Sequence, residues 1–221
     1  MSFMLQEARE SAERVAAQDF SSALALAEVL KARPPRGVVT VGRGTSDHAL
    51  GYLAYVLMHS RGMPVASLPP SLSSVLATSW QVEGYLALAA SQSGSPPDVI
   101  AMLQALAVGG AQSAALGNVV PSPLAEASQH VLPVQAGEEK SVAATKSFIA
   151  TVTLALRLLA HWHGDAALMQ ALDALPERLH QAAQADWAAA IEVLRSQERL
   201  FVVGRGTGLP VAQEAALKCK E

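Results

Sequence analysis

Short apolar runs alternate with longer segments of helical periodicity through the middle of the chain. Each run is four to six residues long, and small polar residues or glycine follow most of them, as expected for strands buried on both faces. The runs cover residues 37–41, 64–68, 85–90, 113–116 and 130–134, and helical segments cover 98–108 and 145–161. This alternation predicts βαβ units that build a parallel sheet.

Further helices are expected on both sides of this central region. Alanine- and leucine-rich segments predict two of them at residues 4–16 and 21–31 and two more at 165–183 and 187–197. Polar residues mark three helix starts, at Thr45 or Ser46, at Ser95 as the N-cap before two prolines, and at Ser141. The pair of glycines after Val108 is expected to end the helix that begins after Ser95.

Charged residues avoid the middle of the sequence. Of the 35 Asp, Glu, Lys and Arg residues, 12 lie in residues 1–47, 19 in residues 138–221 and only four between them. We therefore expect the middle to form the core. Its longest uncharged stretch, 99–125, is interrupted by glycines and prolines and does not predict a membrane-spanning helix.

One five-residue sequence occurs twice. Val-Gly-Arg-Gly-Thr fills residues 41–45 and again 203–207, an offset of 207 − 45 = 162 residues, which indicates a duplicated domain rather than a solenoid. The second copy is expected to hold one strand and one helix before the chain ends at Glu221. The predicted organisation is lead-in helices at 1–34, a complete domain at 35–164, connecting helices at 165–197 and the truncated beginning of a second domain at 198–221.

Composition narrows the possible functions. With 51% apolar residues the chain can bury a substantial core, and a charged fraction of 16% indicates further burial between subunits. A net charge of −3 offers no basic surplus for nucleic acid. The single cysteine, Cys219, excludes a disulfide framework, and the charged N-terminus lacks the apolar core of a secretory signal. We expect a cytoplasmic protein.

A serine-rich turn is the first candidate site. Residues 91–95 read Ser-Gln-Ser-Gly-Ser and follow a predicted strand at the edge where α/β sheets bind ligands. The hydroxyls of Ser91, Ser93 and Ser95, with free backbone N–H groups, form a cradle for a dianion without any lysine or arginine. The alternative is an ordinary serine-rich turn.

A second strand-to-helix turn, Gly-Arg-Gly-Thr-Ser at residues 42–46, has a similar character. Thr45 and Ser46 supply two more hydroxyls. Asp47 stands where a dinucleotide fingerprint has its third glycine, and no P-loop lysine follows. A nucleotide cofactor is therefore disfavoured.

The last predicted helix carries candidate proton-transfer groups. Glu214, Lys218 and Glu221 are spaced i, i+4 and i+7, so they share one helix face. The alternative is a solvated surface ion pair. The six histidines show no metal-ligand spacing with carboxylates, and no metal site is expected.

Together these motifs resemble the sugar isomerase (SIS) family. Besides the turns at 42–46 and 91–94, the similarity rests on Ser-Val-Ala-Ala-Thr-Lys at 141–146 and on residues 214–221. The chain is similar to the isomerase part of glucosamine-6-phosphate synthase and to stand-alone aminosugar-phosphate isomerases and deaminases. The resemblance implies a three-layer αβα fold with a flavodoxin-like parallel sheet, followed by the start of a second such repeat.

The resemblance also implies which residues bind substrate. The phosphate of a hexose phosphate would lie on the two turns, and backbone groups near residue 142 would touch the sugar. The complete candidate set is Thr45, Ser46, Ser91, Gln92, Ser93, Ser95, Val142 and Ala143. Two positions depart from the synthase pattern, since Pro96 and Ala144 replace hydroxyl residues. At these two positions the sequence is closer to the stand-alone isomerases and deaminases.

Roles for the last helix follow from the same resemblance. Glu221 would move a proton between C1 and C2 of the open-chain sugar, Lys218 would stabilise the enediolate charge, and Glu214 would orient Lys218. We expect an isomerase or deaminase that acts on an aminohexose phosphate as a homodimer, without metal, nucleotide or glutaminase domain. The alternatives are a phosphosugar-sensing module without turnover and a simple aldose–ketose phosphosugar isomerase.

Overall fold

A five-stranded parallel sheet is the centre of the computed structural model, which describes residues 2–221. The strands are β1 (Val38–Val41), β2 (Val65–Ser67), β3 (Leu86–Ser91), β4 (Gln112–Gly117) and β5 (His130–Pro133). Each overlaps one predicted apolar run, with β3 and β4 reaching one residue beyond theirs, and the order β2-β1-β3-β4-β5 is the flavodoxin-like order. The predicted fold class is confirmed.

Burial on both faces explains why the strands are almost wholly apolar. Every residue of β1 and β3 is buried, and the two strands pair in register from Val38 with Leu86 to Val41 with Ala89. Successive side chains point to opposite faces. Leu88 therefore joins one apolar cluster, and its neighbour Ala89 joins the other.

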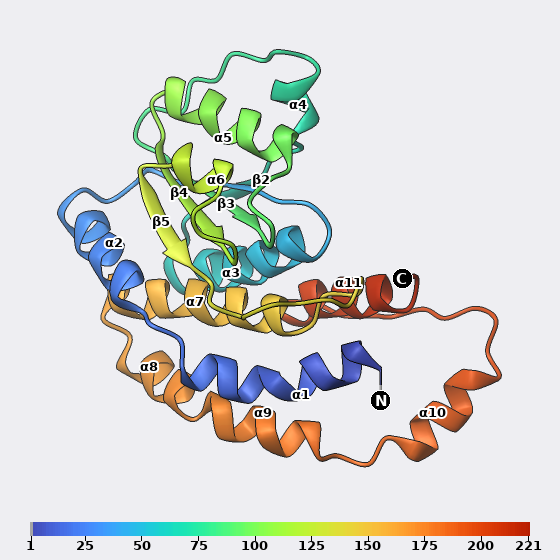
Figure 1. Cartoon of the computed structure of the whole chain (residues 1–221). Helices are drawn as coiled ribbons and strands as arrows, with labels where there is room; N and C mark the ends of the chain where they lie inside the picture. Colours follow the sequence, from blue (N-terminus) through green and yellow to red (C-terminus); the bar gives the residue numbers. More distant parts are fainter. Residues whose placement is uncertain (1) are drawn as a thin grey trace.

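Helices cover both faces of the sheet and complete the three layers (Figure 1). One face is covered by α2 (Ser21–Ala32), α3 (Thr45–Arg61) and α7 (Lys146–His163). The other is covered by α5 (Pro97–Val108) and α6 (Pro123–Glu126), and α4 (Ser71–Ser74) packs on α5. The α5 helix ends at the expected glycines, with Gly109 as its C-cap.

The remaining helices lie outside these layers. They are α1 (Phe3–Ala16), α8 (Ala166–Asp173), α9 (Leu175–Ala183), α10 (Ala188–Arg195) and α11 (Gly208–Lys218). The α1 helix packs against both α7 and α9, and α11 packs against α3 (Figure 1). In the described part of the chain, no helix combines the length and apolarity needed to cross a bilayer.

Two of the three predicted helix starts are wrong. Ser95 is not the N-cap of α5, because Pro96 holds that position and the Ser95 hydroxyl donates to the carbonyl of Ser93 at 3.2 Å. The start expected at Ser141 lies later, since α7 begins at Lys146. Of these three starts, only that of α3 is as predicted, at Thr45.

Two further segments differ from the sequence-based expectation. The single helix expected at 165–183 is divided at Ala174, and Pro176 stands in the first turn of α9, where its missing N–H breaks no hydrogen bond. The strand expected in the second copy is absent, since residues 199–205 have no sheet partner among the residues described.

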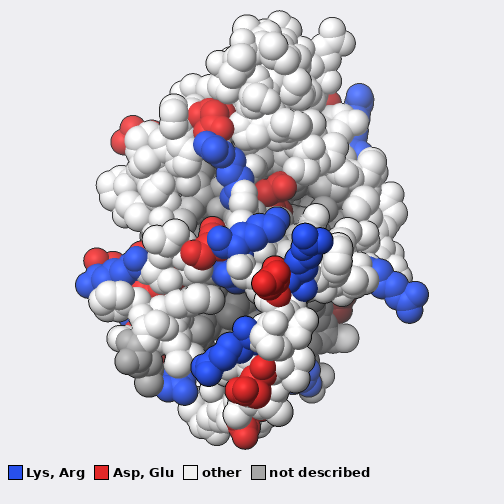
Figure 2. Space-filling model, turned by 90° about the vertical axis from the view of Figure 1, so that its right-hand side faces the viewer, with Lys and Arg blue, Asp and Glu red and all other residues white. Residues whose placement is uncertain are grey.

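Charged side chains occupy only part of the surface. Figure 2 shows the face at the right of Figure 1, where Lys, Arg, Asp and Glu gather in the central and lower parts and leave the upper part almost bare. This distribution follows the sequence, because the uncharged middle of the chain builds the sheet and the helices above it (Figure 1).

Candidate functional site

The two predicted turns meet at the topological switch point of the sheet. The chain leaves β1 toward β2 on one side and leaves β3 toward β4 on the other, so the carboxyl ends of β1 and β3 border a crevice. Residues 42–44 follow β1, and residues 92–96 follow β3. This crevice is where an open α/β sheet binds ligands.

The serine-rich turn is organised by its own hydroxyls. Ser91 is buried, and its hydroxyl accepts a hydrogen bond from the N–H of Gly94 at 3.1 Å. The hydroxyl of Ser93 accepts from the N–H of Ser95 at 3.3 Å, and both of these serines are exposed. The exposed Ser93 hydroxyl is open to a ligand, the Ser95 hydroxyl donates to the Ser93 carbonyl, and the Ser91 hydroxyl accepts a hydrogen bond within the turn.

Glycine is required at the centre of this turn. Gly94 has a φ of +65°, and a Cβ on it would lie 2.2 Å from the hydroxyl oxygen of Ser122. Any other residue would be strained and would displace the neighbouring loop. The turn therefore packs directly against the Ser122 side chain in the segment after β4.

A small cavity connects the two turns. Its volume is about 30 Å³, far below the ~300–1,000 Å³ of a typical ligand pocket, so it can enclose only part of a sugar phosphate. Four of the predicted binding residues line it, namely Thr45, Ser46, Ser91 and Gln92. Asn118, Ala144, Ser147 and Thr151 also line it and were not predicted. The Thr45 hydroxyl makes a different contact.

The loop before α7 reaches the cavity from the other side. Ala144 lines the cavity, Ala143 is buried and Val142 is 87% exposed. The predicted contact of residues 142 and 143 with a sugar stays a prediction, because neither lines the enclosed space and only their backbone was expected to take part.

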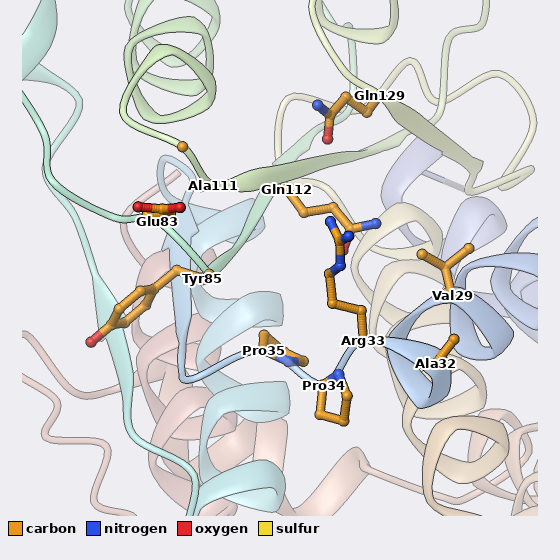
Figure 3. Close-up of a pocket in the computed structure, with 12 residues that line it drawn as sticks. Val29, Ala32, Arg33, Pro34, Pro35, Glu83, Tyr85, Ala111, Gln112 and Gln129 are labelled. Atoms are coloured by element: carbon orange, nitrogen blue, oxygen red, sulfur yellow. The ribbon is translucent and has the colours of Figure 1, made fainter.

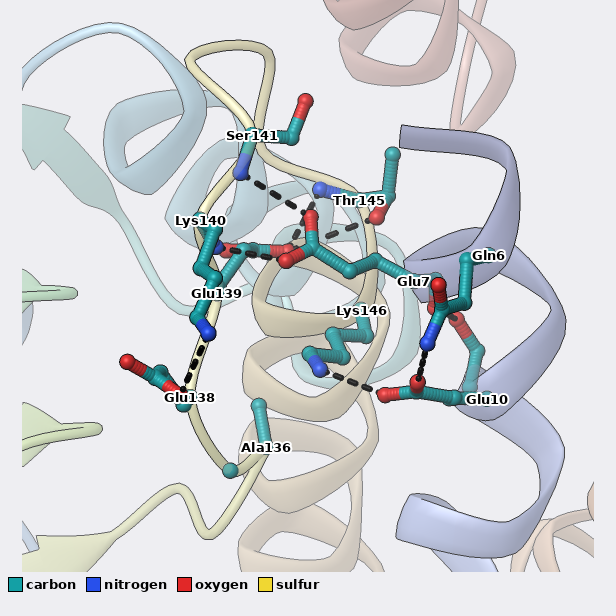
Figure 4. Close-up of polar contacts among 12 residues, drawn as sticks. Gln6, Glu7, Glu10, Ala136, Glu138, Glu139, Lys140, Ser141, Thr145 and Lys146 are labelled. Carbon is teal, nitrogen blue, oxygen red and sulfur yellow. Dashed lines mark hydrogen bonds and ion pairs between the residues drawn. The ribbon is translucent and has the colours of Figure 1, made fainter. Parts of the chain in front are cut away.

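Two carboxylates hold this loop in place (Figure 4). Glu7 of α1 is buried and accepts hydrogen bonds from the N–H groups of Lys140 at 2.5 Å and Ser141 at 3.1 Å. Glu139 accepts from the N–H groups of Thr145 at 2.8 Å and Ser147 at 3.2 Å, and from the Ser147 hydroxyl. The Glu139 carboxylate therefore satisfies amides at the start of α7 that lack a helical partner.

A buried ion pair fixes α1 beside the same loop. Lys146, whose side chain is 3% exposed, lies 2.6 Å from the Glu10 carboxylate (Figure 4). The hydrogen bond from Lys146 holds the pKa of Glu10 below its usual value. The lead-in helix is thus a structural support of the site rather than an appendage.

The three predicted catalytic residues form one cluster with Thr45. Lys218 Nζ lies 3.3 Å from Glu214 Oε1 and 2.6 Å from Glu221 Oε2. The Thr45 hydroxyl donates to Glu214 Oε1 at 2.8 Å and lies 3.3 Å from Lys218 Nζ. Glu214 is buried and Glu221 is exposed. The interpretation of this face as a solvated surface pair is therefore wrong for Glu214.

Close packing of α11 on α3 brings this cluster to the switch point. A side chain on Gly51 would touch the ring of Pro210 at 3.5 Å, and one on Gly44 would touch Leu217 at 3.6 Å. Because Thr45 is the first residue of α3 and borders the small cavity, the cluster and the cavity share a wall. Residues about 170 positions apart in sequence thus form one candidate site.

Sequence reasoning missed His48 and the loop-holding carboxylates. The Nδ1 atom of His48 lies 2.7 Å from Glu214 Oε2. His48 lies three residues after Thr45, so the two side chains share one face of α3. Because this spacing is not a metal-ligand pattern, it did not identify His48 in the sequence. For Glu7 and Glu139, no local pattern distinguishes a carboxylate that accepts from distant amides.

A larger cavity, of about 790 Å³, lies at the opposite end of the sheet (Figure 3). Arg33 and Glu83 supply its charges. Its glutamines are already engaged, since Gln112 contacts His130 at 2.9 Å and Gln129 accepts from the N–H of Ser113 at 3.1 Å. It contains none of the predicted residues and lies at the amino ends of the strands, away from the switch point.

Comparison with known proteins gives independent information on the family of this chain. A family model described as SIS domain matches residues 33–161. The glutamine–fructose-6-phosphate aminotransferase (isomerizing) of Pyrobaculum aerophilum is 36% identical over 231 residues, covering 99% of this chain and 38% of that protein. The enzyme of the same name from Symbiobacterium thermophilum is 34% identical and covers 90% of this chain and 34% of its own length. The chain thus spans less than two fifths of the curated relatives it matches.

A solved structure agrees closely with the fold. A candidate phosphosugar isomerase from Silicibacter pomeroyi superposes with a TM-score of 0.95 at 41% identity, covering all of this chain and 68% of that one. The C-terminal domain of glucosamine–fructose-6-phosphate aminotransferase from Francisella tularensis has a TM-score of 0.78 at 24% identity, covering all of this chain and 67% of that one, and shares the fold.

Proposed function

The chain belongs to the SIS domain family, and on that basis we propose that it is an isomerase or deaminase that acts on an aminohexose phosphate. The family resemblance read from the sequence motifs is confirmed. The observation that carries the proposal is the cluster of Glu214, Lys218 and Glu221 beside the serine-rich turn, since this arrangement joins an anion cradle to a pair of proton-transfer groups.

Substrate binding in this proposal begins with the phosphate. The hydroxyl and amide groups of Ser46, Ser91 and Gln92, with the exposed hydroxyls of Ser93 and Ser95, hold the dianion at the switch point. Hydrogen bonds to a charged group each contribute about 1.5–3 kcal/mol net. Because the enclosed cavity is small, the sugar extends along the open rim toward α11.

Proton transfer then follows from the cluster. The Glu221 carboxylate removes the proton from C2 of the open-chain sugar, and the C–H electron pair forms a double bond to C1 as the C1 carbonyl becomes an oxyanion. The Lys218 ammonium, 2.6 Å from Glu221, stabilises that charge. Return of the proton to C1, with a second proton passing from nitrogen to oxygen, gives a 2-imine that water hydrolyses to ketose phosphate and ammonia.

The choice of a stand-alone isomerase or deaminase over the synthase reaction rests on two substitutions. Pro96 and Ala144 stand where hydroxyl residues are expected in the synthase pattern, and Ala144 lines the small cavity. The proposal for the whole protein is a cytoplasmic homodimer in which residues 198–221 begin a second domain. This chain covers 68% of the Silicibacter structure, so that relative is longer than residues 1–221.

A direct assay tests the proposal. Purified protein is expected to release ammonia and fructose-6-phosphate from glucosamine-6-phosphate, and Glu221→Gln is expected to abolish turnover, because the amide cannot accept the proton. General acid–base groups typically contribute about 10²–10⁴-fold in rate. The control is Glu192→Gln on the exposed α10 helix, which should keep full activity.

Other outcomes of the same assay identify the alternatives. Equal activity in Glu221→Gln contradicts the assigned role. Thermal stabilisation by hexose phosphates without any turnover favours a sensing module. Conversion of fructose-6-phosphate to an aldose phosphate without amine chemistry favours a simple isomerase.

A further inference from the structure

His48 extends the α11 cluster into the interior. It lies in the first turn of α3, and its side chain is 18% exposed. Its Nδ1 atom contacts Glu214 Oε2 at 2.7 Å, while the other oxygen of that carboxylate faces Thr45 and Lys218. A continuous path therefore runs from His48 through Glu214 and Lys218 to Glu221.

The chemistry of this contact fixes the state of the imidazole. A carboxylate only accepts hydrogen bonds, so Nδ1 must carry the proton and donate it to Glu214. In the neutral ring this leaves Nε2 unprotonated. His48 is thus held in one tautomer. It presents a single N–H group, at Nδ1, to the cluster.

That N–H determines which oxygen of Glu214 remains for Lys218. With Oε2 occupied by His48, Glu214 can offer only Oε1 to the ammonium, at 3.3 Å, and Lys218 lies closer to Glu221, at 2.6 Å. Without the donor, the buried Oε2 would lack a partner, and the nearest available cation is Lys218. An unsatisfied buried carboxylate oxygen would therefore draw Lys218 away from Glu221.

We propose that His48 is a positioning residue that, by donating Nδ1–H to Glu214, keeps Lys218 directed at Glu221 and the reacting carbons. This inference rests on the proposed function, because Lys218 and Glu221 are its reacting groups. His48 itself touches neither substrate nor reacting atoms in this role.

Three substitutions separate this role from the alternatives. In His48→Asn the amide nitrogen occupies nearly the position of Nδ1 and can donate to Glu214. In His48→Gln the amide lies near the position of Nε2, and His48→Leu removes both groups. We expect Leu and Gln to lower kcat about 10²-fold, the typical effect of an ångström-scale misplacement, with little change in KM. His48→Asn should recover most of the lost kcat.

Other patterns of activity overturn the proposal. If Gln retains activity and Asn does not, Nε2 is the working atom. If all three variants keep the wild-type kcat, His48 positions nothing. The control is His59→Leu, an exposed position on the same helix that should change neither constant. Circular dichroism and thermal melting of each variant exclude loss of folding as the cause of a lower kcat.

A spectroscopic measurement separates failure of this inference from failure of the proposed function. With ¹⁵N-labelled histidine, the resonances of His48, identified by their loss in His48→Asn, should show a proton on Nδ1 whether or not the protein turns over a sugar phosphate. A ring protonated only at Nε2 overturns the inference. A ring protonated at Nδ1 in a protein without turnover supports the contact and counts against the proposed reaction.

Discussion

At the scale of single residues, Gly94 shows how one missing side chain shapes the serine-rich turn. Its N–H donates to the Ser91 hydroxyl, its φ of +65° suits glycine, and the Ser122 side chain fills the space that a Cβ would need. Gly62 offers a matched comparison. Its φ is +61°, yet nothing lies within 4 Å of the place where its Cβ would be.

Gly94→Ala is therefore expected to weaken binding of hexose phosphates much more than Gly62→Ala. Both substitutions cost about 1–2 kcal/mol of stability from left-handed strain, but only the first displaces the cradle. Isothermal titration with a hexose phosphate and thermal melting of both variants make the comparison. Equal affinities for the two variants would contradict the role of the turn.

Residues that sequence patterns identified differ in kind from those they missed. Ser46, Ser91 and Gln92 belong to turns with local signatures, so they could be named in advance and do line the cavity. His48 meets Glu214 across 166 positions, and such a partner depends on how α11 packs on α3. No local pattern encodes it.

At the scale of helices and strands, α1 supports a loop it does not adjoin in sequence. The Glu7 carboxylate, 5% exposed, accepts from two amides of the segment before α7, and Glu10 pairs with Lys146 (Figure 4). A buried charge with these partners ties the lead-in helix to the wall of the small cavity.

Glu7→Gln is expected to lower the free energy of unfolding by about 1–3 kcal/mol, because one amide of the loop loses its acceptor in the buried contact. Glu13→Gln, an exposed position on the same helix, should change it by less than about 0.5 kcal/mol. Urea unfolding followed by circular dichroism measures both. A Glu7 variant as stable as the Glu13 variant would show that the loop needs no support from α1.

Among the helices and strands, the sequence predicted the strands of the sheet but wrongly predicted one more strand near the end of the chain. Each of the five strands overlaps a predicted run, because burial on both faces leaves a strong apolar signal. Residues 200–203, Leu-Phe-Val-Val, are an equally apolar run, yet among the described residues no strand pairs with them. Apolar character alone does not make a strand, since the hydrogen bonds of a sheet come from a neighbour.

At the scale of the whole molecule, partly buried histidines link stability to pH. Burial lowers the pKa of His130, His161 and His163 below the usual value. The contact of His130 agrees with this direction, because the Gln112 amide nitrogen donates to its Nε2 at 2.9 Å and a protonated ring could not accept.

Acidification is therefore expected to destabilise the protein from about pH 6.5 downward, where the unfolded chain starts to bind protons that the folded chain does not. Stability is fully present above this value and falls as the pH drops toward the lowered pKa values of the folded state. Melting temperatures measured from pH 7.5 to 5.5 test this.

His130→Gln should make that fall smaller, whereas His59→Gln, at an exposed position, should leave it as in the wild type. A pH profile that is the same for wild type and His130→Gln would exclude His130 as a source of the acid sensitivity.

The contact of α11 with α3 has a consequence for how the polypeptide tolerates cleavage. Residues 185–203 are exposed throughout, so a protease could nick this connection without disturbing the sheet. The two fragments would then be held by the fit of Pro210 over Gly51 and by the contacts of Glu214 with Thr45 and His48. In the nicked protein, the activity would depend on association of the two fragments. Dilution would separate the fragments and mixing would restore the complex.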